Sequence, residues 1–218
     1  MPGPVIGVFG GAFAPFHNGH LRLAIEARDQ LGLDRVHLIP TAQPPHRRGS
    51  AVAGATRLAW IEAAIQGEVG LIADDCELRR QGLSYTYHTV EALRARYPDQ
   101  PLLLMIGADA FAQLHTWHRW QALLSLAHLL VCARPGAALL PSAQTQGFLA
   151  SRRARAADEL RAQNSGLWMS FDLPLLQISS TRIRQLLRHD RSVRALVPDV
   201  ILNTLSADDR AALIADQS

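Results

Sequence analysis

Two glycines and two histidines near the N-terminus have types and spacing suited to binding phosphate. The run Gly10-Gly11-Ala12-Phe13 follows an apolar segment, and His17 and His20 stand three residues apart beyond it. The glycines would let a phosphate approach the backbone, and a helix starting there would point free N–H groups at the anion. Because residues three apart share a helix face, and Gly19 leaves the space between them open, both imidazoles could donate to triphosphate oxygens and to a leaving pyrophosphate.

A zinc site and a helix start without a function are the two alternatives for this segment. Two histidines at this spacing without a third ligand make a poor zinc site, so no metal ligand is predicted. Either histidine alone would suggest a helix start without a function. The combination with Gly-Gly after a strand favours the nucleotide interpretation, although the loop lacks the third glycine of one common phosphate motif and the Gly-Lys-Ser/Thr of the other.

A second motif, residues 178–184, combines hydroxyls with two arginines. Ser179, Ser180 and Thr181 precede a segment of helical period, where capping is the structural alternative. The same hydroxyls, the helix start and Arg184 would cradle the β- and γ-phosphates of a nucleotide. The chain contains no lysine, since all 22 of its basic residues are arginine, so arginine, histidine, backbone N–H groups or a metal must hold any phosphate.

Short apolar runs that alternate with helical segments predict the elements that position these residues. Strands are expected at 5–9, 36–39, 102–106 and 129–132, with a further possible strand at 167–171. The segments between them carry apolar residues at helical spacing, for example Leu58, Ile61 and Ile65. Strands without polar alternation, separated by helices, predict an α/β fold with a Rossmann-like doubly wound parallel sheet.

Ligands bind such sheets at the carboxyl ends of the strands, so the residues that follow each strand are candidates. These include His46, Gly107, Asp109 and Arg134, besides the glycines after the first strand. A plain helix cap is the serious alternative for Asp109. Residues 136–166 are interpreted as a loop and a surface helix without an assigned role.

Composition limits the class of partner. The net charge of +3 and the pI of about 9.4 suit an anionic small substrate and are too weak, without a clustered basic face, to indicate nucleic acid. No apolar run is long enough to cross a bilayer, and no leader precedes the first strand, so a cytoplasmic protein without a membrane partner is expected. A single domain over residues 1–205, followed by a tail at 206–218, is predicted.

The first motif resembles the Gly-Gly-x-Phe-Asp-Pro-x-His-x-Gly-His signature of the nucleotidyltransferase superfamily related to class I tRNA synthetases. Ala14 stands where that signature has an acid, which would shape the turn or help to place a metal. The second motif is similar to the superfamily's Ile-Ser-Ser-Thr-x-Ile-Arg element. The resemblance implies that Gly10, Gly11, Phe13, Gly19, Ser179, Ser180, Thr181 and Arg184 bind ATP and that His17, His20 and Arg184 act in catalysis.

The middle of the chain resembles bacterial nicotinate-nucleotide adenylyltransferases through nearly its whole length to about Pro198. Five segments carry this resemblance: Pro44–Arg47, Ser84–Thr86, Ile106–Asp109, Thr116–Trp117 and Arg134–Gly136. It implies transfer of AMP from ATP, with Mg²⁺, to nicotinate mononucleotide, which yields nicotinate adenine dinucleotide and pyrophosphate. The tyrosine-rich ending common in that family is missing from residues 202–218.

The resemblance also implies the residues that bind the mononucleotide. Trp117 would stack on the cationic pyridine ring, and Tyr85 and Thr86 would offer backbone N–H groups to the carboxylate. Gly107 and Asp109 would lie against ribose hydroxyls. Arg134 and His46 would bind the phosphate of the mononucleotide. The alternatives are another adenylyl- or cytidylyltransferase, acting on nicotinamide mononucleotide, phosphopantetheine or an alcohol phosphate, or a non-catalytic nucleotide-binding protein of the same fold.

Overall fold

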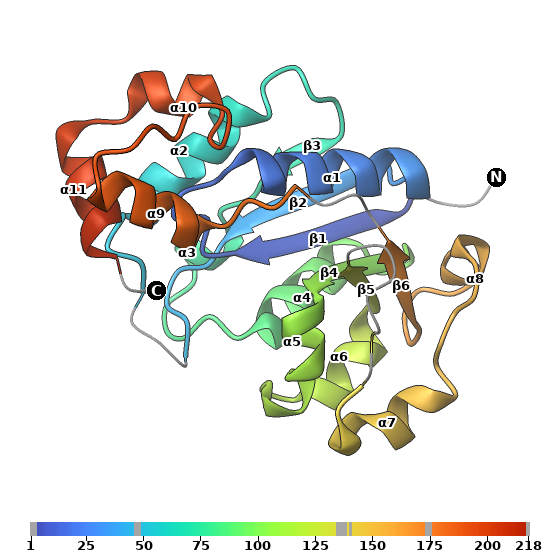
Figure 1. Ribbon diagram of the computed structural model, residues 1–218. Coiled ribbons are helices and arrows are strands. Elements are labelled where there is room, and N and C mark those ends of the chain that lie inside the picture. The colour runs from blue at the N-terminus through green and yellow to red at the C-terminus, as the bar shows by residue number, and fades with distance from the viewer. Residues whose placement is uncertain (1–3, 46–48, 134–138, 140, 173–175, 217–218) are drawn as a thin grey trace. The chain divides into compact units, whose positions relative to one another are not determined.

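The computed structural model describes residues 4–45, 49–133, 139, 141–172 and 176–216 of the 218-residue chain (Figure 1). It divides into two compact units. Unit 1 comprises Met1–Phe9, Glu26–His37 and Tyr85–Pro174, and unit 2 comprises Gly10–Ile25, Leu38–Ser84 and Leu175–Ser218. Both predicted phosphate-binding motifs belong to unit 2, whereas Tyr85, Gly107, Asp109 and Trp117 belong to unit 1.

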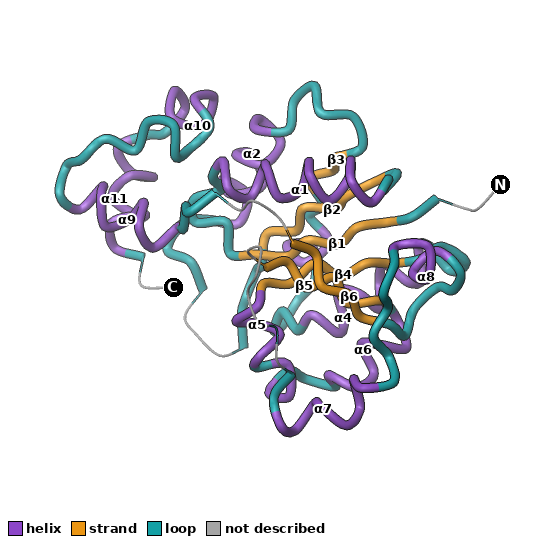
Figure 2. Tube along the Cα trace, turned by 45° about the vertical axis from the view of Figure 1, so that its right-hand side comes forward, coloured by secondary structure: helices purple, strands orange, loops and turns teal. Residues whose placement is uncertain are grey.

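One six-stranded sheet forms the frame of the fold, drawn in orange in Figure 2. The strands are β1 (Ile6–Gly11), β2 (Arg35–Pro40), β3 (Leu71–Ala73), β4 (Leu102–Gly107), β5 (His128–Ala133) and β6 (Trp168–Asp172). Their order is β3-β2-β1-β4-β5-β6, and β4 pairs in parallel with both β1 and β5, as β5 does with β6. The sequence order therefore reverses between β1 and β4, which is where α/β sheets bind ligands.

The strands are buried along most of their length, as their unalternating apolar sequences predict. Every residue of β5 is buried, and so are five of the six residues of β2 and of β4. The prediction of a Rossmann-like doubly wound parallel sheet is confirmed. The five predicted strands differ from the observed ones by one or two residues at their ends, and the three-residue strand β3 was missed because it is too short to show a period.

Helices flank the sheet (Figure 1). The helix α1 (Asn18–Leu31) begins in unit 2 and ends in unit 1. The other helices of unit 1 are α4 (Thr86–Arg96), α5 (Ala108–Ala112), α6 (Trp120–Leu126), α7 (Ala143–Ala150), α8 (Ala157–Arg161) and the 3-10 helix Leu114–Thr116. Those of unit 2 are α2 (Gly54–Ala64), α3 (Cys76–Arg79), α9 (Ser180–Arg188), α10 (Asp199–Thr204) and α11 (Ala207–Ala215).

Two regions of the chain differ in detail from the sequence interpretation. In α2 the buried side chains are Arg57, Trp60 and Ile61, so an arginine occupies the helix face where Leu58 was expected. Where one surface helix was expected in the segment 136–166, the described residues form two short helices, α7 and α8. Among the described residues, no helix is long and apolar enough to cross a membrane.

Candidate nucleotide-binding and active site

The segment 10–16, which comprises the last two residues of β1 and most of the loop that leads to α1, is held by two buried arginines; we call this segment the β1 turn. The Arg57 guanidinium donates to the carbonyl oxygen of Ala12 over 2.7 Å, and the Arg184 guanidinium donates to the carbonyl oxygen of Ala14 over 2.9 Å. Only 2% of Arg57 and 5% of Arg184 are exposed. The carbonyl oxygens of Ala12 and Ala14, which would repel a phosphate, therefore accept hydrogen bonds from cationic side chains.

Aromatic packing fixes the shape of the β1 turn. Phe13 has a positive φ of 49° and is 2% exposed, and its ring meets that of Phe16 edge-on with centroids 5.4 Å apart. Gly11 lies directly beneath that ring, because a Cβ placed there would meet the Phe13 ring at 2.8 Å. At Gly10 the nearest atom to such a Cβ, the Ile39 carbonyl oxygen, is 4.0 Å away.

Substituting these two glycines by alanine should therefore have different effects. Gly11→Ala is expected to lower the free energy of unfolding by about 1–3 kcal/mol, because the buried Phe13 ring must shift. Gly10→Ala should leave stability nearly unchanged and weaken ATP binding, because its methyl group would take space that a phosphate needs. Urea denaturation and nucleotide titration of both variants measure this; equal stability loss at the two positions would contradict the packing argument.

The two histidines of the first motif form a reciprocal pair. The backbone N–H of His17 donates to Nδ1 of His20, and the backbone N–H of His20 donates to Nδ1 of His17, each over 3.3 Å. Their rings stack with centroids 3.5 Å and planes 13° apart. Since both Nδ1 atoms accept, the proton of each neutral ring resides on Nε2. A Cβ on Gly19 would meet the His17 ring at 3.1 Å, so the glycine leaves room for the pair.

Both imidazoles are neutral at physiological pH. Burial lowers the pKa of His17 from 6.5 to about 4, an effect only partly offset by its backbone hydrogen bond. Burial also lowers the pKa of His20 well below 6.5, and the adjacent His17 lowers it further. The pair therefore offers Nε2–H donors without the cost of holding two positive charges side by side.

The lowered pKa of His17 predicts how stability depends on pH. Below pH 6.5 the unfolded state binds a proton that folded His17 refuses down to about pH 4, so stability falls as the pH falls through this window. The destabilisation that His17→Gln causes at about pH 7.5 should therefore shrink by about 2 kcal/mol at about pH 5. Urea denaturation of both proteins at the two pH values measures it, and a pH-independent difference would contradict the assignment.

At the start of α1, where free N–H groups were expected, the N–H groups of Asn18 and His20 are already hydrogen-bonded. The Asn18 N–H donates to the Leu196 carbonyl over 2.9 Å, and its side-chain amide donates to the Ala195 carbonyl over 2.8 Å. The His20 N–H donates to His17. The loop after α9 therefore occupies part of this helix start, and the two imidazoles remain candidate donors to a phosphate.

The second motif forms the start of α9 as predicted. Ser179 is the N-cap, because its hydroxyl accepts from the Arg182 N–H over 3.2 Å. The Ser180 hydroxyl donates to the Pro15 carbonyl over 3.1 Å, and Thr181 is exposed. Both Ser180 and Arg184 thus connect α9 to the β1 turn, so the two motifs lie together in unit 2. Their contacts with ATP remain predictions.

In unit 1 the residues predicted to bind the mononucleotide lie at element boundaries. Tyr85 precedes the first residue of α4, Thr86, so both backbone N–H groups lie at a helix N-terminus. The Tyr85 ring packs on the His118 ring with centroids 4.5 Å apart, which places the residue after Trp117 beside Tyr85. His118 was not singled out in the sequence, although it adjoins the predicted stacking residue.

Trp117, Gly107 and Asp109 are accessible to a ligand. Trp117 is half-buried and ends the 3-10 helix, immediately before Arg119, whose φ is 51°. Gly107 ends β4 and has open space where a Cβ would be, and Asp109 is exposed in the first turn of α5. His46 and Arg134 lie outside the described residues.

Sequence reasoning missed Arg57, whose place beside the β1 turn was nonetheless partly visible. It precedes Trp60 by three residues and Ile61 by four, so it shares their helix face. A charged residue on an apolar face needs a buried partner. The sequence gives no means of identifying that partner as the Ala12 carbonyl, 45 residues away.

Among the described residues, no group of three or more histidine, cysteine, aspartate or glutamate side chains is arranged to hold a metal ion. In the His17–His20 pair each Nδ1 accepts a backbone N–H, so neither can also ligate a metal through that atom. The donor set fits a cation that arrives bound to phosphates better than one held by the protein itself.

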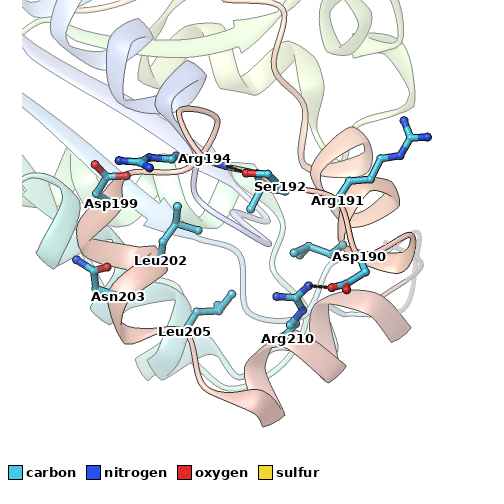
Figure 3. A pocket seen from close by; sticks show the side chains of 11 residues that line it. Asp190, Arg191, Ser192, Arg194, Asp199, Leu202, Asn203, Leu205 and Arg210 are labelled. Carbon is cyan, nitrogen blue, oxygen red and sulfur yellow. Dashed lines mark hydrogen bonds and ion pairs between the residues drawn. The ribbon is translucent and has the colours of Figure 1, made fainter.

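A cavity of about 770 Å³ lies among α9, α10 and α11 (Figure 3). It is lined by Leu187, Asp190, Arg191, Ser192, Val193, Arg194, Asp199, Leu202, Asn203, Leu205 and Arg210. Arg210 of α11 reaches the Asp190 carboxylate over 2.6 Å at its edge, where Asp190 is almost fully exposed and Arg210 is half-buried. None of the described site residues lines this cavity, so it is separate from the β1 turn.

Comparison with known proteins places the chain in a family. The family model for cytidylyltransferase-like proteins matches residues 8–186. A protein of Marinobacter nauticus named "Probable nicotinate-nucleotide adenylyltransferase" is 41% identical over 201 residues, with 92% of this chain and 93% of the relative covered. A protein of the same name from Pseudomonas fluorescens is 44% identical over 208 residues, with 94% and 96% covered.

Solved structures show the same fold. The nicotinic acid mononucleotide adenylyltransferase of Plasmodium falciparum complexed with NaAD matches with a TM-score of 0.71 at 12% identity, over 93% of this chain and 95% of that one. At such low identity the likeness carries the fold alone, and the sequence relatives carry the family. The chain belongs to the cytidylyltransferase-like family and, within it, to the bacterial nicotinate-nucleotide adenylyltransferases.

Proposed function

We propose that the chain transfers AMP from ATP to nicotinate mononucleotide and releases pyrophosphate, which makes it an enzyme of NAD biosynthesis. The observation that carries the proposal is the neutral His17–His20 pair, packed beside a turn whose carbonyl oxygens are held by Arg57 and Arg184. Sequence relatives over nearly the whole chain bear the name of this activity. Two Nε2–H donors beside a glycine turn suit the α- and β-phosphates of a nucleotide.

The reaction needs positioning and charge stabilisation rather than a protein nucleophile. The mononucleotide phosphate is largely dianionic at neutral pH, since its second pKa is about 6. Its oxygen attacks the α-phosphorus in line, and the bond to the bridging oxygen of pyrophosphate breaks. In this proposal His20 and His17 donate from Nε2 to oxygens that gain charge in the transition state, and Arg184 holds the departing phosphates.

Mg²⁺ enters this proposal with the substrate, as MgATP. It would neutralise charge on the phosphates that leave, which is its usual role in nucleotide chemistry. The chain's own residues then bind and orient the nucleotide: Gly10 and Gly11 permit close approach, and Ser179 and Thr181 stand at the start of α9. The enzyme is proposed to work in the cytoplasm on these small anionic substrates, without a nucleic acid or membrane partner.

The mononucleotide half of the proposal predicts a stacking role for Trp117. Trp117→Ala should raise KM for nicotinate mononucleotide about tenfold, with little change in KM for ATP, because the cationic ring loses its aromatic partner. Trp117→Phe should recover most of the loss. Initial rates with each substrate varied in turn measure this. A larger effect on ATP than on the mononucleotide would contradict the role.

Pyrophosphate release with purified protein and MgATP tests the function itself. Nicotinate mononucleotide, nicotinamide mononucleotide and phosphopantetheine should be compared at equal concentration. Release with the first, and much less with the others, is expected, because the N–H groups of Tyr85 and Thr86 suit a carboxylate. Fastest release with phosphopantetheine would indicate a different nucleotidyltransferase. ATP binding without any release would indicate a non-catalytic nucleotide-binding protein.

A further inference from the structure

Arg57 joins the β1 turn to the loop that precedes α2. Besides the bond to the Ala12 carbonyl, its Nε donates to the Val52 carbonyl over 3.1 Å. Burial lowers the pKa of Arg57, and the negative charges of Asp216 and Glu77 act against this shift. A guanidinium is nonetheless charged at any physiological pH, so its buried charge has to be compensated by nearby carboxylates.

Asp216, close to the C-terminus, is one of these two carboxylates. It is 2% exposed, and its Oδ2 accepts from the Ser50 hydroxyl over 2.5 Å and from the Ala51 N–H over 3.2 Å. The Val52 N–H in turn donates to the Ser50 hydroxyl over 3.1 Å. A continuous set of hydrogen bonds therefore runs from Asp216 through residues 50–52 to Arg57 and the β1 turn.

Asp216 and the last turn of α11 are held in this place by α9. The Arg188 guanidinium donates to the Ile214 carbonyl over 2.8 Å and to the Asp216 carbonyl over 2.9 Å. Nearer the start of α11, Arg210 contacts the exposed carboxylate of Asp190 at the edge of the cavity in Figure 3. Asp216 and Arg210 thus both fasten the C-terminal segment, but only Asp216 belongs to the set of contacts around Arg57.

We propose that Arg57 is a positioning residue for adenylyl transfer and that Asp216 holds it in place, so that the residue following α11 helps to set the geometry of the β1 turn. This inference rests on the proposed function, since the turn affects the reaction only if it receives ATP. Glu77 supports the same arrangement from α3, where its carboxylate accepts from the Ala42 N–H over 3.4 Å. A purely structural connection is the alternative.

Three variants of the full chain distinguish the two roles. Asp216→Asn removes the charge but keeps one acceptor oxygen, and Arg57→Lys keeps the charge but loses the fork that spans Val52 and Ala12. Arg210→Gln is the matched control, because it loosens α11 without touching the Arg57 contacts. Calorimetric titration with α,β-methylene-ATP and Mg²⁺ gives Kd without the second substrate, and a melting curve gives the stability of each variant.

Asp216→Asn and Arg57→Lys are each expected to raise the Kd for the analogue about tenfold. The Kd of Arg210→Gln should stay within about twofold of that of the unaltered chain. If Asp216→Asn and Arg57→Lys fold and bind the analogue with the same Kd as the unaltered chain, and only their melting temperatures are lower, the inference is overturned. An equal weakening of binding by Arg210→Gln would also overturn it, because α11 would then act through stability alone. Absence of binding to the unaltered chain would instead contradict the proposed function itself.

Discussion

His20→Asn is expected to lower kcat about 100-fold or more while leaving the affinity for an ATP analogue within a few-fold of the original. In the folded protein His20 accepts the His17 N–H at Nδ1, so its proton lies on Nε2. The amide of asparagine reaches about as far as Nδ1, so the variant can keep the contact with His17. It lacks a donor at the Nε2 position, where charge is proposed to develop in the transition state.

His20→Gln is the matched comparison, because its amide nitrogen can reach the position of Nε2. It should recover at least about tenfold of the activity that asparagine loses. Single-turnover rates at saturating MgATP and nicotinate mononucleotide separate the chemical step from binding. Equal loss in both variants would show that a donor at Nε2 is not what matters, and unchanged turnover in His20→Asn would remove His20 from the catalytic residues.

Arg184→Lys is expected to reduce kcat/KM for ATP about 100-fold even though the positive charge is kept. The Arg184 guanidinium donates to the Ala14 carbonyl, and the fork of a guanidinium allows it to hold a phosphate at the same time. A lysine ammonium is a point donor at the end of a flexible chain, so it would serve either the turn or the phosphate. The buried position also disfavours a strongly hydrated ammonium group.

The lower kcat/KM of Arg184→Lys is expected to come from both weaker ATP binding and slower turnover. Its Kd for the ATP analogue should rise, because one ammonium cannot hold both the Ala14 carbonyl and a phosphate. Arg184→Met, which removes the charge as well, should bind the analogue more weakly still. Kinetics together with calorimetry measure both effects, and a lysine variant with full kcat/KM would show that the guanidinium fork has no part in the reaction.

The sheet could be predicted from the sequence because its strands carry continuous apolar runs. Those of β4 and β5 are buried over nearly their whole length, so their composition alone indicates a parallel sheet covered by helices. β3, with three residues, has no such signal. The prediction of the buried face of α2 was partly wrong, because hydrophobicity alone favours Leu58 on that face, whereas Arg57 is buried there.

The two motifs predicted to bind phosphate stand out in the sequence because each combines rare residue types at close spacing. The contacts that these motifs make could not be predicted, because those contacts join segments far apart in the sequence. Asn18 bonds to the Ala195 carbonyl 177 residues away, and Ser180 bonds to the Pro15 carbonyl 165 residues away. The first contact takes up part of the α1 start, so fewer backbone N–H groups there can bind a phosphate than the sequence predicted, whereas the imidazoles were already expected as donors.

The central claim, transfer of AMP to a mononucleotide phosphate, is tested most directly by following the α-phosphorus of ATP. The purified chain should be incubated with nicotinate mononucleotide, Mg²⁺ and ATP labelled at the α-phosphorus, or in a parallel reaction at the γ-phosphorus. The account predicts that the α-label appears in nicotinate adenine dinucleotide and the γ-label in pyrophosphate. An α-label that remains in ADP or AMP, with no dinucleotide formed, would contradict it.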